Sequence, residues 1–71
     1  MTNEEYAVTC YKDGKIALEV HTPWRSKAGL LAVYYVKTGE YDRVEKRGPK
    51  STMIHTLRNG KLHTEFREEK R

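Results

Sequence analysis

The sequence predicts a small all-β domain that folds as an antiparallel meander of three consecutive β-hairpins. Three observations support this prediction. Asn59-Gly60 lies within a stretch of apolar and β-branched residues, and Asn-Gly readily adopts the two positive φ angles of a type I′ turn. A similar glycine-centred pattern with apolar flanks recurs at Asp13-Gly14 and Thr38-Gly39. Apolar and polar residues also alternate on both sides of Asp13-Gly14, which is typical of a half-buried antiparallel pair.

The first hairpin is expected from about Glu5 to His21, and its register depends on the loop. A two-residue Asp13-Gly14 loop would mix apolar and charged residues on both faces. A three-residue loop that begins at Lys12 instead gathers the apolar residues on one face, so we favour it. That face would hold Tyr6, Val8, Cys10, Ile16, Leu18 and Val20.

The middle segment, residues 21–50, permits two interpretations. Thr22-Pro23, apolar residues at helical spacing and a following Gly39 indicate a helix at about 23–37. Gly29 lies inside that segment, however, and residues 33–36 are rich in strand formers. We favour strands at 30–36 and 41–47, the second of them an edge because it is poor in aliphatic residues. An α+β fold of ββαβββ order is the alternative.

The last hairpin, residues 51–66, is expected to turn at a two-residue Asn59-Gly60 loop. This register sets Leu57 against Leu62 and Met53 against Phe66, and it puts His55 and Thr64 between those pairs on the same face. His63 and Ile54 would then point to the opposite face.

Length and composition limit the chain to a single domain, residues 1–71, with frayed ends at 1–4 and 67–71. A chain of 71 residues buries a marginal core, and a single cysteine excludes an internal disulfide, so we expect a homodimer. No apolar run approaches the roughly 20 residues of a membrane span. The acidic start also lacks the pattern of a signal peptide, so we expect a soluble cytoplasmic protein.

The net charge of +4 lies entirely in the second half, where nine bases face five acids, against five of each in residues 1–40. Such asymmetry favours RNA or single-stranded DNA, or an acidic protein surface, as the partner, although bases on exposed strands also prevent edge aggregation. The candidate nucleic-acid-binding residues are Arg43, Lys46, Arg47, Lys50, Arg58, Lys61 and, for stacking, Tyr41. Further bases at the end are Arg67, Lys70 and Arg71.

The other large aromatic residues, Trp24, Tyr34 and Tyr35, are expected mostly in the core, because a chain with one Trp and one Phe needs its rings to fill the interior. Any of them near the bases would also provide a stacking platform for nucleic acid.

Catalytic, metal and cofactor sites have little support in the sequence. His55 and His63 fall on opposite faces in the favoured register, and no further zinc ligands follow a recognised spacing. Cys10 lies in mid-strand without an activating neighbour. We therefore predict no enzyme, no metal and no cofactor, but a binding protein for RNA or single-stranded nucleic acid. The alternative is a protein-binding inhibitor or adaptor that blocks a partner enzyme through a sheet edge or an aromatic patch.

Overall fold

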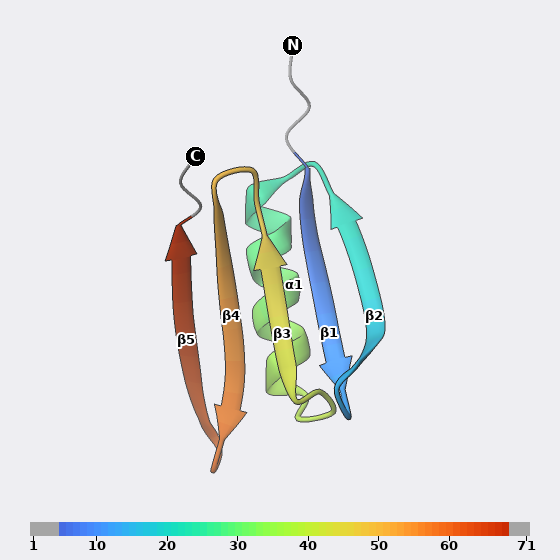
Figure 1. Ribbon diagram of the computed structural model, residues 1–71, viewed down its shortest axis with the longest axis vertical. Coiled ribbons are helices and arrows are strands. Elements are labelled where there is room, and N and C mark those ends of the chain that lie inside the picture. Colours follow the sequence, from blue (N-terminus) through green and yellow to red (C-terminus); the bar gives the residue numbers. More distant parts are fainter. Residues whose placement is uncertain (1–4, 69–71) are drawn as a thin grey trace.

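The computed structural model describes residues 5–68, which form one antiparallel five-stranded sheet with a helix packed against one of its faces (Figure 1). The sheet order is β2-β1-β3-β4-β5. In chain order the elements are β1 Tyr6–Lys12, β2 Lys15–Thr22, α1 Arg25–Lys37, β3 Arg43–Arg47, β4 Ser51–Arg58 and β5 Lys61–Glu68.

The predominance of antiparallel strands and the first and last hairpins are confirmed, whereas the middle hairpin is wrong. Residues 25–37 are helical, as the ββαβββ alternative predicted. Tertiary packing overrides the strand propensity of this segment, because the sheet needs a cover for its apolar face. Ala28, Ala32 and Val36, four residues apart, are fully buried and form the stripe of α1 that faces the sheet.

The core lies between α1 and the central strands. Fully buried Val8, Cys10 and Val44 of β1 and β3 oppose the buried stripe of the helix. Alanine at two of the three stripe positions lets the helix backbone approach the sheet closely. The helix packs against β1 to β4, and Figure 1 shows β5 lying beyond it. All eight residues of β5 are exposed.

The turn of the first hairpin is the two-residue Asp13-Gly14 loop, so the predicted three-residue loop is wrong. Asp13 and Gly14 both have positive φ angles, 54° and 77°. A register shift after Cys10 leaves Ala17 without a partner, so Cys10 pairs with Leu18 rather than with Ile16. This β-bulge absorbs one residue and keeps Leu18 and Val20 opposite Cys10 and Val8 despite the shorter loop. The predicted core position of Ile16 is wrong, because Ile16 pairs with Tyr11 and is 59% exposed.

β3 is the central strand of the sheet, not an edge, because β1 and β4 pair with it on its two sides. Its single aliphatic residue, Val44, is sufficient since only one face of the strand is covered by the helix. Arg67 and Glu68, which were predicted to fray, belong to β5. The other residues of the predicted frayed ends, 1–4 and 69–71, lie outside the described residues.

The last hairpin has the predicted register, with Leu57 opposite Leu62 and His55 opposite Thr64. Nδ1 of buried His55 lies 3.0 Å from the Thr64 hydroxyl. His63 pairs with Thr56 and therefore points to the other face. Within residues 5–68, no three His, Cys, Asp or Glu side chains are grouped to hold a metal ion. No helix in this part of the chain is long and apolar enough to span a bilayer.

Candidate anion-binding site

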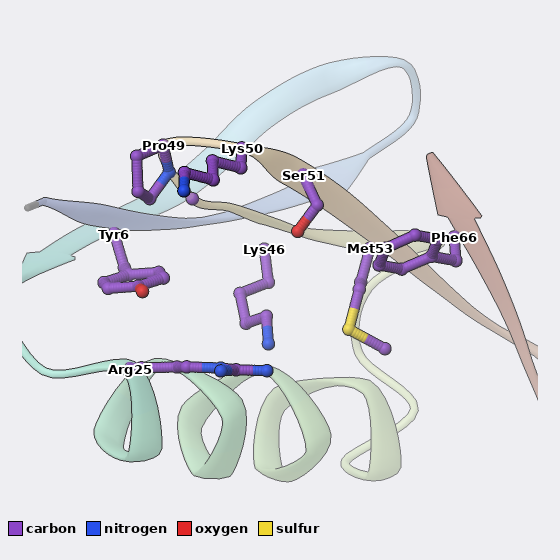
Figure 2. Close-up of a pocket in the computed structure, with 9 residues that line it drawn as sticks. Tyr6, Arg25, Lys46, Pro49, Lys50, Ser51, Met53 and Phe66 are labelled. Atoms are coloured by element: carbon purple, nitrogen blue, oxygen red, sulfur yellow. The ribbon is translucent and has the colours of Figure 1, made fainter. Parts of the chain in front are cut away.

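A pocket of about 310 Å³ opens on the helix-covered side of the sheet, between the first turn of α1 and the turn that joins β3 to β4. We call it the basic pocket. Figure 2 shows Lys46 pointing from β3 toward the guanidinium of Arg25. The lining consists of Tyr6, Arg25, Lys46, Gly48, Pro49, Lys50, Ser51, Met53 and Phe66. These residues include three cations and no carboxylate.

Arg25 is the first residue of α1, which begins two residues later than the sequence pattern suggested. Trp24 is the N-cap, with extended backbone, and its N–H donates to the Thr22 hydroxyl at 3.3 Å. No side chain caps the helix and no acidic residue occupies its first turn. The positive end of the helix dipole is therefore not compensated by a side-chain cap or by an acid within the first turn of the helix.

Gly48 sets the position of the turn that forms the other wall. Its N–H donates to the Ser51 carbonyl at 2.8 Å. A Cβ at this position would lie 2.7 Å from Cε2 of Tyr6, so only glycine lets the turn rest on the tyrosine ring. The turn brings Pro49 and Lys50 to the rim of the pocket (Figure 2).

Lys46 pairs with Val8 and Met53, which directs its side chain to the helix side of the sheet. Burial lowers the pKa of Lys46, and the neighbouring Arg25 lowers it further. The two cations thus repel each other, and none of the described residues that line the pocket is an acid. A bound anion would remove this repulsion and would compensate the desolvation of the ammonium group.

His55 lies near this group but adds no positive charge to it at neutral pH. Burial lowers the pKa of His55, and the charge of Lys46 lowers it further. The imidazole is therefore held neutral between Lys46 and the Thr64 hydroxyl. The charge of the pocket comes from its lysines and its arginine.

The opposite, helix-free face of the sheet also carries cations, but its acids pair with them. The side chain of Glu45 is 12% exposed and lies 3.1 Å from Arg43 Nε and 3.6 Å from Arg47 Nη2. Arg67 Nη2 is 2.9 Å from Glu65. The Arg43 guanidinium also stacks over the Tyr11 ring, 4.3 Å from its centre. These arginines already have partners for their charge.

The structure divides the binding residues predicted from the sequence into three groups. Lys46 and Lys50 line the basic pocket. Arg43, Arg47, Arg58 and Lys61 share the helix-free face, as does Arg67. Tyr41 packs against the core in the connection from α1 to β3. Lys70 and Arg71 lie outside the described residues.

The aromatic residues are divided between core and surface. Tyr35 and Tyr41 pack against the core with their rings edge to face, 6.0 Å apart. Trp24 and Tyr34 are 62% and 64% exposed, so the expected core position is wrong for these two. Lys27 lies 5.8 Å from the centre of the Trp24 ring.

Sequence reasoning named only Lys46 and Lys50 as binding residues among the nine lining residues of the pocket, and it missed the third cation, Arg25, and the two rings, Tyr6 and Phe66. Arg25 belongs to the half of the chain with no net charge, so the charge asymmetry directed attention elsewhere. The helix interpretation would have placed Arg25 in a first turn without acids, which is the one signal that pointed to it.

Comparisons of the chain with protein-family models, with curated proteins and with solved structures found no match.

Proposed function

We propose that this chain is a small non-enzymatic protein that binds RNA or single-stranded DNA and holds a phosphate of the strand in the basic pocket. The observation that carries the proposal is the convergence of Arg25, Lys46 and Lys50 in a pocket whose lining, within residues 5–68, includes no carboxylate. The proposal retains two of the residues predicted from the sequence and adds Arg25.

The chemistry of the pocket suits a nucleotide better than a bare anion. The cations and the free N–H groups at the start of α1 provide donors for phosphate oxygens. Tyr6 and Phe66 line the same pocket, and Phe66 is 59% exposed. Aromatic rings beside a basic groove let bases stack with little sequence preference. We therefore expect binding that tolerates sequence changes and weakens strongly with salt.

The test is fluorescence anisotropy with a labelled single-stranded oligonucleotide, titrated with protein at several salt concentrations. The double variant Arg25→Gln/Lys46→Gln should weaken binding by about tenfold or more and should reduce the salt dependence, because two phosphate contacts are lost. The matched control is Arg58→Gln/Lys61→Gln, which removes the same charge from the helix-free face. Equal losses in both variants, or binding insensitive to salt, would refute the pocket as the site.

The second candidate function, a protein-binding inhibitor or adaptor, is favoured by the outer face of α1. Trp24, Leu30 and Tyr34 are more than 60% exposed, and Leu30 and Tyr34 lie one helical turn apart. Exposed large apolar and aromatic residues, such as the neighbouring Leu30 and Tyr34, are typical of contact hot spots.

This candidate is tested by affinity capture from a nuclease-treated lysate, with matched variants as bait. A protein partner that binds the wild type and Arg25→Gln/Lys46→Gln, but not Trp24→Ala/Leu30→Ala/Tyr34→Ala, would assign the contact to the helix. A partner retained by the triple variant would remove this helix face as the contact.

A further inference from the structure

We propose that β5 pairs with β5 of a second copy of this chain, so that two sheets join into one continuous antiparallel sheet of ten strands about a two-fold axis. The strand lies at the edge of the sheet, all eight of its residues are exposed, and α1 does not cover it. The proposal goes beyond the binding function and does not depend on what the pocket binds.

The two edges of the sheet differ in how they are protected. The edge formed by β2 carries the bulge at Ala17, which interrupts its ladder. β5 pairs with β4 without any register shift from Lys61 to Glu68 and contains no proline. A regular exposed edge of this kind is a template for another strand.

The hairpin register determines which backbone groups of β5 are free. Arg58 and Lys61 flank a two-residue turn and therefore exchange hydrogen bonds, and such pairs alternate along an antiparallel ladder. The N–H and C=O groups of Leu62, Thr64 and Phe66 are thus expected to point away from β4. A second strand would satisfy them.

Side-chain complementarity selects a two-fold axis at Thr64. This register sets Leu62 against the partner's Phe66, and both residues are partly exposed, at 41% and 59%, on the helix side of the sheet. On the other face it sets His63 against the partner's Glu65. Lys61 then lies opposite the partner's Arg67, a repulsion that the ion pair from Arg67 to Glu65 offsets. An axis at Glu65 would instead oppose two carboxylates and two basic side chains.

The symmetry of this pairing has a consequence for the pocket, and this step alone rests on the proposed function. The two-fold axis is perpendicular to the continuous sheet. Both helices and both basic pockets therefore lie on the same face of that sheet. One strand of nucleic acid could then contact both pockets, which would raise the apparent affinity of the dimer above that of one chain.

The test is sedimentation of the wild type beside two variants of Thr64. Thr64→Pro and Thr64→Val both lose the hydroxyl that contacts His55, but only proline also removes the outward N–H. We expect the wild type and Thr64→Val to reach twice the chain mass of 8.3 kDa as concentration rises. Thr64→Pro should dimerise at least about tenfold more weakly, because two symmetric hydrogen bonds are lost.

Circular dichroism checks that both variants fold, and Leu62→Lys provides an independent second disruption outside the basic pocket. Undiminished dimerisation of a folded Thr64→Pro or Leu62→Lys variant would assign the dimer to another surface and overturn the proposal. A wild type that sediments as a single chain up to millimolar concentration would also overturn it and would leave the edge to a different protein. Thr64 does not line the basic pocket. A monomeric Thr64→Pro variant that still binds an oligonucleotide would therefore show that dimerisation and binding at the pocket are independent.

Discussion

Both faces of the sheet carry cations, but among the described residues the ion pairs between arginine and carboxylate lie on the helix-free face. On the helix-free face, Glu45 lies within 3.6 Å of two arginines and Glu65 lies 2.9 Å from Arg67. On the helix-covered face, Arg25 and Lys46 repel each other in a pocket with no carboxylate in its lining.

This difference teaches that the number of bases along a chain does not define an anion site. Arg43 and Arg47 are among the candidate residues predicted from the sequence, yet Glu45 between them neutralises much of their charge. Arg25 lies in the half of the chain with no net charge and still contributes one of the three cations that line the basic pocket. The placement of acids decides which cations are available.

The largest effect is expected when an acidic residue is introduced into the lining of the basic pocket. Ser51→Glu would place a carboxylate among the cations of the lining, as Glu45 is placed on the other face. Affinity for a single-stranded oligonucleotide should fall by more than about tenfold, since the introduced charge both pairs with the cations and repels phosphate. The control is Thr52→Glu, the next residue, which pairs with Arg47 on the helix-free face. It should have a much smaller effect in the same anisotropy titration, and equal losses would contradict the comparison.

The turn that forms one wall of the pocket can be tested through Gly48. Gly48→Ala should lower the free energy of unfolding by about 1–3 kcal/mol, because the new Cβ forces the Tyr6 ring to move. Chemical denaturation measures this cost. Gly29→Ala is the matched control: its Cβ would meet no atom within 4 Å, and in a helix it should stabilise by about 0.5–1 kcal/mol. If both variants lose similar amounts of unfolding free energy, the close approach of Gly48 to Tyr6 does not require glycine.

The buried histidine beside the pocket makes stability depend on pH. Because burial and Lys46 lower the pKa of His55, the unfolded state binds protons more readily than the folded state below the ordinary value of 6.5. The free energy of unfolding should therefore be highest above that value and should fall by up to about 1 kcal/mol as pH drops below it. Denaturation at pH 7.5 and 5.5 measures this. His55→Gln should remove most of the dependence and His63→Gln should preserve it; a wild type whose stability does not fall would contradict the interpretation.

The smallest expected effect is on the free energy of unfolding, which the partly buried charge of Lys46 lowers. Lys46→Met should raise the free energy of unfolding by about 0.5 kcal/mol, because it removes a desolvated charge and its repulsion with Arg25, both moderated by solvent. The same variant should bind an oligonucleotide more weakly. If the pocket binds an anion, Lys46→Met should raise stability and lower affinity. A variant that loses both stability and affinity would indicate that Lys46 makes a stabilising contact.

Local sequence signals predicted the two outer hairpins better than the centre of the chain. Asn59-Gly60 determined both the turn and the register of the last hairpin, because its two residues adopt positive φ angles of 52° and 76°. The bulge at Ala17 could not be predicted, since it is a compromise between a short turn and an apolar face. The helix was the less favoured interpretation because residues 33–36 suit a strand, and only the need to cover the sheet decides against that.

The candidate site was predictable only in part for the same reason. Lys46 and Lys50 could be named from the charge distribution, but their convergence with Arg25 depends on the helix and on the close approach of Gly48 to Tyr6. The strand predicted at 41–47 puts Glu45 on one face with Arg43 and Arg47, but the sequence did not indicate that this strand is central to the sheet.

Mapping backbone amide chemical shifts by NMR during titration with a single-stranded oligonucleotide tests the central claim most directly. If the basic pocket binds phosphate, the amides of Arg25, Ser26, Gly48 and Ser51 should shift with one common dissociation constant. The amides of Arg43 and Glu65 should shift little. Shifts confined to the helix-free face, with the pocket unchanged, would contradict the account.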